Sequence, residues 1–279
     1  MEQMVIDPEG RITTKKQKTI ERIKMFEPPE GYYLAFSGGK DSIVTYHMLK
    51  EAGVKFDSHY NWTTVDPPEL VYFIKEHYPD VVFEKPKRTM WQLIVDKGMP
   101  PTRLARYCCQ ELKEGGGEGR FVATGVRWAE SIKRRGRSEV EFDAYGGKSK
   151  KAIADREIFL NSDNDDKRRM IENCQKKSKH ILNPIVDWED WEVWEYIKGN
   201  NIPYPSLYDE GFRRLGCILC PMATPKEKKK MEARWPKYKQ NYIKAFARML
   251  ERRKEKGKDD SGGKWGNSAK EVYRWWVSY

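Results

Sequence analysis

The stretch that most constrains this chain is residues 31–51, which read GYYLAFSGGKDSIVTYHMLKE. Residues 32–36 form a short continuous apolar run, as expected of a strand that is buried on both faces. Residues 37–42 then predict a sharp glycine turn, and apolar residues at helical spacing follow from Ile43. A buried strand, a glycine turn and a helix start in this order predict a parallel α/β sheet with an anion site at the turn.

The residue types of this turn suit a phosphate. Gly38 and Gly39 let backbone N–H groups approach an anion closely, and the helix N-terminus favours negative charge. Lys40 adds a mobile positive charge, and Ser37 and Ser42 add hydroxyl donors. The pattern is not the Walker sequence, which has four residues between Gly and Gly-Lys. A tight turn that needs glycine for its backbone geometry alone is the structural alternative, but the six residues together favour phosphate binding.

Strand and helix patterns alternate along the rest of the chain. They predict an α/β fold with a doubly wound, mostly parallel sheet covered on both faces. Further strands are expected at residues 54–60, 81–83 and 121–125, and helices at 15–26, 70–76, 90–97 and 189–198. The expected organisation is an N-terminal helical arm (1–30), a nucleotide domain (31–222, with a polar insertion at about 138–179) and a basic helical C-terminal extension (223–279).

Asp66 follows the second predicted strand, in the segment WTTVDPPE. Ligands of open parallel sheets lie beyond the carboxyl ends of strands, so Asp66 is a candidate partner for the ribose or base of a nucleotide. Asp-Pro-Pro-Glu is also an ordinary helix start, with Asp as the N-cap and Pro at the first position. The helix start is the favoured interpretation, and nucleotide binding stays open.

The segment 183–198 predicts a helix over residues 189–198 that Asp187 caps. Trp188, Trp191, Trp194 and Ile197 recur near every third residue of this segment. A stripe of this spacing is more often part of a core than a stacking surface, so we expect all four side chains to be buried.

The segment 124–131, TGVRWAES, lies at the end of a predicted strand. Arg127 at this position is placed to clamp a phosphate or sulfate with two hydrogen bonds, and Glu130 is placed to orient it. Gly125 belongs to the same predicted nucleotide site. The alternative is a solvated run of charges, which we favour for Arg135 and Arg137 but not for Arg127.

The cysteines occur in pairs. Cys108 and Cys109 are adjacent in RYCCQELK, and Cys217 and Cys220 form a CxxC pair in GCILCP. Four thiolates of this kind hold zinc or an iron–sulfur cluster. Adjacent cysteines diverge, which favours a cluster over a single tetrahedral zinc. Burial in the core is the structural alternative, and Cys174 stays open as a ligand, a sulfur carrier or a core residue.

Composition narrows the cellular setting. No apolar run approaches the ~20 residues of a membrane span, and the N-terminus lacks a signal-peptide pattern. An odd number of cysteines without a secretion signal is typical of reduced thiols, so we expect a cytoplasmic protein with no membrane partner. The net charge is +11, and residues 226–256 hold thirteen Lys and Arg against four Asp and Glu. This basic segment predicts a nucleic-acid surface or, equally, the solvated face of a packed helix.

In combination, these motifs resemble the phosphoadenylyl-sulfate (PAPS) reductase family of the adenine nucleotide α-hydrolase superfamily, whose members typically cut or exchange ATP between its α and β phosphates. The resemblance spans about residues 31–222 and rests on SGGKDS, TTVDPPEL, RYCCQELK, GVRWAES, NPIVDWEDWEVWEYI and LYDEGFRRLGCILCP. Members with a CC…CxxC set resemble adenylyl-sulfate reductases with a [4Fe-4S] cluster, and the set is also similar to that of the ATP-pyrophosphatase component of bacterial DNA phosphorothioation. The resemblance implies that Ser37, Gly38, Gly39, Lys40, Asp41 and Ser42 hold phosphates and that Cys108, Cys109, Cys217 and Cys220 hold the cluster.

One departure from the family bears on the activity. Sulfonucleotide reductases attack sulfur with a cysteine in a C-terminal ECG-type motif, whereas no cysteine follows Cys220 here. A thiosulfonate intermediate would then need Cys174 or a partner protein as its nucleophile.

The leading hypothesis is therefore an enzyme that activates an acceptor with ATP and Mg²⁺, releases pyrophosphate and prepares the acceptor, with nucleic acid as one candidate, for sulfur transfer. Its catalytic residues would be Lys40, Asp41 and Arg127, and a cysteine desulfurase is a candidate partner. The first alternative is an adenylyl-sulfate or PAPS reductase that releases sulfite with thioredoxin. The second is a non-catalytic nucleotide-binding accessory subunit. A homo-oligomeric state is expected.

Overall fold

The computed structural model describes residues 4–6, 12–113, 115–141, 180–257 and 265–278. Cys174 and most of the predicted insertion lie outside these residues. The chain divides into two compact units, each assembled from three segments. The first unit comprises Met1–Tyr60, Tyr72–Phe83 and Gly116–Arg214, and the second comprises Asn61–Val71, Glu84–Gly115 and Leu215–Tyr279. Within the described part of the chain, no helix combines the length and the apolar character that crossing a bilayer requires.

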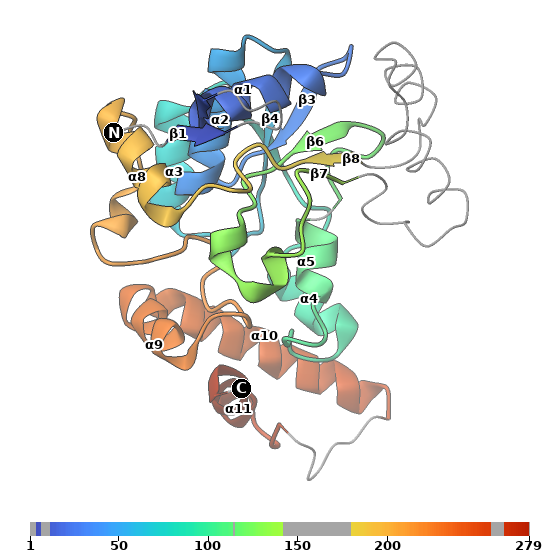
Figure 1. Ribbon diagram of the computed structural model, residues 1–279. Coiled ribbons are helices and arrows are strands. Elements are labelled where there is room, and N and C mark those ends of the chain that lie inside the picture. The colour runs from blue at the N-terminus through green and yellow to red at the C-terminus, as the bar shows by residue number, and fades with distance from the viewer. Residues whose placement is uncertain (1–3, 7–11, 114, 142–179, 258–264, 279) are drawn as a thin grey trace. The chain divides into compact units, whose positions relative to one another are not determined.

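A six-stranded sheet forms the centre of the first unit, in the order β5-β4-β3-β6-β8-β7 (Figure 1). Strand β3 pairs in parallel with β4 and β6, and β6 pairs in parallel with β8, whereas the edge strand β7 is antiparallel to β8. The chain builds outward from β3 to one side and then returns to its other side with β6, so the predicted doubly wound, mostly parallel sheet is confirmed. The strands are β3 (Tyr32–Ala35), β4 (Phe56–Asn61), β5 (Val82–Glu84), β6 (Phe121–Ala123), β7 (Val140–Glu141) and β8 (His180–Leu182).

The central strand owes its position to its apolar sequence. Tyr32 and Leu34 are fully buried, and Tyr33 packs across two neighbouring strands against Val122 and Ile181. A strand that is apolar on successive residues has no face for solvent, so it takes an interior place in the sheet. The glycine turn that follows β3 therefore emerges at the middle of the sheet edge.

Three helices of this unit pack against one another, α1 with α2 and α2 with α8. A short antiparallel strand pair precedes α1, which the sequence did not predict. These elements are β1 (Met4–Ile6), β2 (Ile12–Thr14), α1 (Lys15–Met25), α2 (Lys40–Ala52) and α8 (Asp190–Gly199), with 3₁₀ turns η1 (Trp128–Glu130), η2 (Ile132–Arg134) and η3 (Ser206–Tyr208). Helix α3 (Pro68–His77) has residues in both units.

The start of α8 differs from the prediction. Glu189, not Asp187, is the N-cap, and its backbone N–H donates to Glu192 Oε2 at 2.7 Å. A tight turn delays the helix, because the N–H of Trp188 donates to the carbonyl of Ile185. Asp187 instead pairs with Arg22 of α1, with 3.3 Å between Nη1 and Oδ1.

The predicted tryptophan stripe is only partly buried. Trp188 and Ile197 are in the core, as expected, but Trp191 is 52% exposed. The apolar residues on the buried face of α8 are Val193, Tyr196 and Ile197, at the spacing of one helical stripe, and Glu192 is buried beside them. The prediction was wrong for Trp191 because the i+3 positions it used drift around the helix, away from this stripe.

The second unit is mainly helical. Its longest helix, α10, contacts α4, α9 and α11. Trp276 of α11 is almost fully buried, with its ring centroid 4.5 Å from that of Tyr242 and 5.5 Å from that of Phe246. The helices are α4 (Met90–Lys97), α5 (Tyr107–Leu112), α9 (Pro225–Arg234), α10 (Pro236–Glu255) and α11 (Ala269–Ser278). The apolar side of the basic segment thus builds a core of its own.

Candidate functional site

The predicted phosphate loop lies between β3 and α2 and is shaped by its own serines. Gly38 has a φ of +70°, which favours glycine, and Gly39 is the N-cap of α2. The hydroxyl of Ser42 accepts from the Ser37 N–H at 3.2 Å and donates to the Gly39 carbonyl at 2.9 Å. These contacts close the loop locally around Gly38.

Two cations and two carboxylates meet at the start of α2. Lys40 Nζ lies 3.0 Å from Asp41 Oδ1 and 3.2 Å from Asp190 Oδ1. The guanidinium of Arg127 has no exposed surface; its Nε is 2.7 Å from Asp41 Oδ1, its Nη1 donates to the Trp188 carbonyl at 2.9 Å, and its Nη2 pairs with Asp190. The structure thus brings together Lys40, Asp41 and Arg127, the three predicted catalytic residues, and adds Asp190.

The cluster keeps its members charged. Burial disfavours the charged guanidinium of Arg127, but the carboxylates of Asp41 and Asp190 outweigh it, so the pKa of Arg127 is raised. Burial likewise acts to raise the pKa of Asp190, yet hydrogen bonding from Arg127 and the charge of Lys40 lower it overall. Sequence reasoning missed Asp190 because an acidic residue in the first turn of a helix is an ordinary helix-start feature.

Gly125 and Glu130 support this cluster from the chain that follows β6. A Cβ atom on Gly125 would lie 2.8–2.9 Å from backbone atoms of Asp41 and Ser42, so glycine permits β6 to approach the start of α2. Glu130 accepts from the backbone N–H of Arg127 at 3.2 Å. Its carboxylate also pairs with Arg134 and, at 3.3 Å, with Arg214. The predicted roles of Gly125 and Glu130 in nucleotide binding remain predictions.

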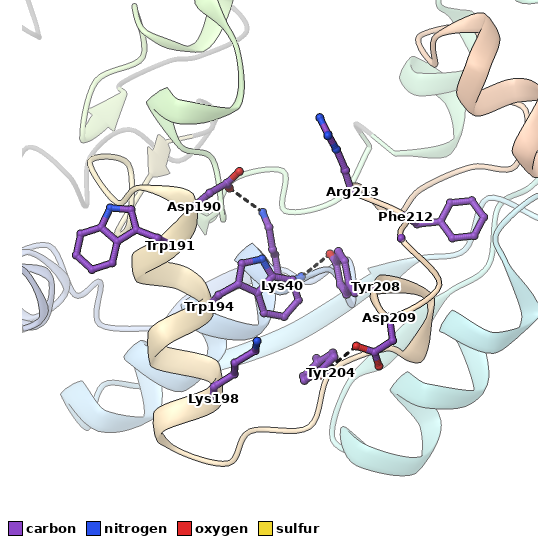
Figure 2. A pocket seen from close by; sticks show the side chains of 11 residues that line it. Lys40, Asp190, Trp191, Trp194, Lys198, Tyr204, Tyr208, Asp209, Phe212 and Arg213 are labelled. Atoms are coloured by element: carbon purple, nitrogen blue, oxygen red, sulfur yellow. Dashed lines mark hydrogen bonds and ion pairs between the residues drawn. The ribbon is translucent and has the colours of Figure 1, made fainter. Parts of the chain in front are cut away.

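A pocket of about 740 Å³ opens beside Lys40, between α8 and the segment around η3 (Figure 2). Tyr208 joins it to the loop, because its hydroxyl accepts from the Lys40 N–H at 2.9 Å. The ring of Trp194 meets Tyr204 and Tyr208 edge to face, at 5.2 and 5.0 Å between centroids. Trp194 therefore lines this pocket, which corrects its assignment to the core. The lining residues are Lys40, Asp190, Trp191, Trp194, Lys198, Tyr204, Tyr208, Asp209, Gly211, Phe212 and Arg213.

Asp66 belongs to the second unit, where it braces a turn. Its two carboxylate oxygens accept from the N–H and the hydroxyl of Thr63, both at 2.7 Å. Its carbonyl accepts from the hydroxyl of Tyr238 at 3.1 Å, and its side chain is buried. Both oxygens thus already have partners, and contact with a nucleotide remains a prediction.

The four paired cysteines are free thiols of the second unit. Cys108 and Cys109 lie on α5, and Cys217 and Cys220 lie in a turn fixed by the Ile218 N–H, which donates to the Val65 carbonyl at 2.7 Å. The pKa of Cys108 is raised by its hydrogen bond with Cys109, by burial, and by the charges of Cys217 and Cys220. The two pairs are therefore close enough for their charges to interact.

The donor set suits a thiolate-bound cluster. Hydrogen bonding from Cys108 lowers the pKa of Cys109 to about 5 in spite of burial, and Arg106 adds to this effect. The negative charge of Cys217 is the largest cause of the raised pKa of Lys113. Among the residues that the structure describes, no three His, Cys, Asp or Glu side chains are arranged to hold a single metal ion. Four cysteines are the number of thiolates that a [4Fe-4S] cluster takes, and cluster binding by this chain remains a prediction.

Comparison with curated proteins gives long matches at low identity. Two uncharacterized proteins of Methanocaldococcus jannaschii are 28% identical over 225 residues and 27% identical over 226 residues, which cover 79% and 77% of this chain. The chain spans 41% and 47% of the length of these two relatives. An adenosine 5′-phosphosulfate reductase of Staphylococcus haemolyticus is 25% identical over 213 residues, covering 72% of this chain and 75% of the relative.

Among solved structures, the phosphoadenylyl-sulfate reductase of Candida auris in a phosphate complex matches with a TM-score of 0.48 and 16% identity, over 72% of this chain and 87% of that one. At the level of families, residues 31–223 match the phosphoadenosine phosphosulfate reductase domain. The match covers most of the chain and includes both the 37–42 loop and the paired cysteines. The chain therefore belongs to the phosphoadenosine phosphosulfate reductase family.

Proposed function

We propose that this chain binds ATP on the 37–42 loop and activates an acceptor for sulfur transfer, with release of pyrophosphate. The observation that carries the proposal is the pair of buried cations, Lys40 and Arg127, at the N-terminus of α2. This place adjoins β3 and β6, where the strand order reverses, and crevices of this kind hold nucleotides in doubly wound sheets. Backbone amides of the loop add donors for the phosphates.

The chain's own residues account for most of the chemistry. An acceptor oxygen attacks the α-phosphorus of ATP, the bond to the bridging oxygen breaks, and pyrophosphate leaves. Lys40 and Arg127 stabilise the charge that grows on the departing phosphates, while the loop amides hold them in line. A cysteine desulfurase is the proposed source of the sulfur, as a persulfide whose S–S bond a thiol reductant cleaves. The sulfide-level nucleophile then forms its bond to the acceptor as the bond from the acceptor to AMP breaks.

The proposal includes two groups from outside the chain. Asp41 supplies a carboxylate of the type that binds Mg²⁺ together with nucleotide phosphates. Cys108, Cys109, Cys217 and Cys220 would hold a [4Fe-4S] cluster, which supplies electron transfer or a bound sulfur. The activation step described above depends on neither the cluster nor its redox state.

An adenylyl-sulfate or PAPS reductase is the second candidate function. The Staphylococcus haemolyticus relative, which carries that name and matches over 75% of its length, favours it. The reaction would cleave the sulfonucleotide and release sulfite, with thioredoxin as reductant. Its nucleophile would be Cys174 or a thiol from outside residues 1–279, since residues 221–279 contain no cysteine. A nucleotide-binding accessory subunit without turnover is the third candidate.

A turnover screen of protein purified without oxygen separates these candidates. We expect pyrophosphate from ATP and no sulfite from adenylyl sulfate or PAPS with thioredoxin. The variant Lys40→Met should lose at least about a hundredfold in rate, because one charged donor to a transition state contributes about 2.7–4 kcal/mol. Lys24→Met, an exposed lysine on α1, is the matched control. Sulfite from either sulfonucleotide would establish the reductase instead, and tight nucleotide binding without turnover would establish the accessory subunit.

A further inference from the structure

The cations of α9 and α10 divide into two groups. One group supports the second unit: Lys228 is buried and donates to the Trp276 carbonyl at 3.3 Å, and Arg234 pairs with Glu69 at 2.8 Å. The other group is exposed and, among the residues that the structure describes, has no carboxylate partner. Its members are Lys226, Lys229, Lys237, Lys244, Arg248 and Lys254. The contacts of the folded chain therefore account for the first group only.

Three cations of the second group lie on one face of α10. Lys237, Lys244 and Arg248 are spaced by seven and then four residues, which is the repeat of a single helical face. The exposed amides of Gln240 and Asn241 lie in the same stretch, and residues 237–248 contain no acidic residue. We call these five residues the α10 stripe. At 1.5 Å per residue it extends for about 16 Å along the helix.

The α10 stripe lacks the apolar groups that a membrane or a protein partner would contact. The opposite side of the helix places Tyr242, Phe246 and Met249 in the core. In α10, all of which the structure describes, no large apolar side chain is exposed. A helix that lies in a membrane surface inserts its apolar face, and the centre of a protein interface is rich in apolar residues. A hydrated polyanion is the partner that this face fits.

The phosphate backbone of a nucleic acid has the matching chemistry. Along one strand of duplex DNA the phosphates follow at about 3.4 Å of axial rise, so a stripe of about 16 Å lies beside roughly five of them. Lysine, arginine, asparagine and glutamine side chains are common donors to phosphate oxygens. Tyr242 and Phe246 are buried and cannot stack on unpaired bases, which favours a duplex over a single strand.

We propose that the α10 stripe binds the phosphate backbone of a nucleic-acid duplex, irrespective of its base sequence. The inference goes beyond the proposed function and does not depend on it, because no residue of the 37–42 loop takes part. DNA and RNA duplexes share the chemistry that the stripe recognises.

The salt dependence of binding by the full chain tests the α10 stripe. The probes are a fluorescent DNA duplex and an RNA duplex of the same sequence, each of about 20 base pairs, and their labelled single strands. The triple variant Lys237→Gln, Lys244→Gln, Arg248→Gln should reduce the slope of log K against log salt by about two to three, or about one for each lost phosphate contact. Affinity for the duplex at about 0.1 M salt should fall roughly a hundredfold.

A matched triple variant controls for net charge. Lys24→Gln, Lys85→Gln, Lys87→Gln removes the same charge from exposed positions outside α9 and α10. It should change the slope by less than about 0.5, because these lysines contact no phosphate in the proposed complex. Both triple variants should keep the melting temperature of the native chain, since substitutions of exposed residues have little effect on stability.

A variant that keeps the charges of the stripe separates charge from shape. Lys237→Arg, Lys244→Arg, Arg248→Lys retains three cations at the same positions. We expect its affinity for the duplex to stay within about threefold of the native value, because backbone phosphates attract either cation.

Each outcome supports or overturns the proposal. Loss of duplex binding in the glutamine variant of the stripe alone supports it, and the tighter of the two duplexes identifies the nucleic acid. Equal loss in both glutamine triples would show that net charge acts without a defined surface and would overturn it. Tighter binding of the single strands, or no duplex binding at about 50 mM salt, would also overturn it. Duplex binding without turnover of ATP would contradict the proposed function alone, so the two failures are distinguishable.

Discussion

The cation cluster of the first unit and the cysteine group of the second differ in how their reactive groups are held. Around Lys40 and Arg127, opposite charges alternate, and the carboxylates of Asp41 and Asp190 accept hydrogen bonds from both cations. The four thiols have no such alternation: the hydrogen bond with Cys109 and burial raise the pKa of Cys108 most, and the charges of the other three cysteines add to this. The ion pairs of the first site therefore stabilise the fold without any bound group. The four cysteines would be stabilised most by a cation that their thiolates share.

Substitution of one cysteine should give the largest effect. In Cys217→Ser we expect iron and acid-labile sulfide to fall from about four of each per chain to near zero, because the cluster loses a thiolate. Elemental analysis of protein purified without oxygen measures this. Cys174→Ser is the matched control and should retain its iron. If both variants lose iron equally, the proposed ligand set is wrong, and zinc in the native chain would make the site a zinc site instead of a cluster site.

Removal of Arg127 should be the most damaging change to the first unit. Arg127→Met leaves Asp41 and Asp190 without their guanidinium, and breaking a buried ion pair costs about 3–5 kcal/mol. Urea denaturation measures the free energy of unfolding. Arg135→Met, at an exposed arginine, should change it by less than about 0.5 kcal/mol. Equal stabilities of the two variants would show that the cluster does not support the fold.

The close approach at Gly125 should give a smaller loss. Gly125→Ala places a methyl group against the backbone of Asp41 and Ser42, and overpacking of this kind costs about 1–3 kcal/mol. Gly136→Ala is the control, because no atom lies within 4 Å of its added Cβ. Thermal unfolding of both variants checks this, and an unchanged melting temperature in Gly125→Ala would contradict the packing role.

Asp190→Asn should shift nucleotide affinity in the favourable direction. The substitution removes a negative charge beside Lys40 and Arg127, which should tighten ATP binding about fivefold, or about 1 kcal/mol at a solvated site. Asp209→Asn removes the same charge from a residue held by Tyr204 and should have less effect. Titration calorimetry measures both, and weaker binding in Asp190→Asn would instead make Asp190 a ligand of the nucleotide's metal.

The smallest expected effect is on acid stability. The pKa of Asp190 is lower in the folded chain than in the unfolded one, so its ion pairs stabilise the fold at pH above about 4. This stabilisation is lost as the pH falls through the lower folded value. The side chain is 73% exposed, so the loss should be well under 1 kcal/mol. The difference in unfolding free energy between native and Asp190→Asn chains at pH 7 and pH 3 checks this, and no change between the two would contradict it.

Much of the fold could be predicted because the informative patterns are local. The apolar run of β3, the glycine turn and the bounds of α4 follow from a few neighbouring residues. The short strands β7 and β8 could not be predicted in this way, because two or three residues carry no periodicity and pairing alone defines them. The two units could not be predicted either, because each is assembled from separated segments and local sequence patterns do not show which segments pack together.

The candidate site likewise contains residues that local motifs predict and residues that only long-range contacts define. Lys40, Asp41 and Arg127 could be predicted because their motifs place them directly after strands. Asp190 and Tyr208 could not, because their contacts with Lys40 join residues about 150 or more positions apart in the chain. Trp191 was misassigned because a spacing of three fits both a core stripe and the flank of a helix.

The interleaved segments have a consequence for dissecting this protein. The chain passes between the units after residues 60, 71, 83, 115 and 214, and the second of these passages falls inside α3. No single cut in the gene therefore yields either half as an uninterrupted polypeptide. Either half could be produced separately only by joining segments that are not consecutive in the sequence.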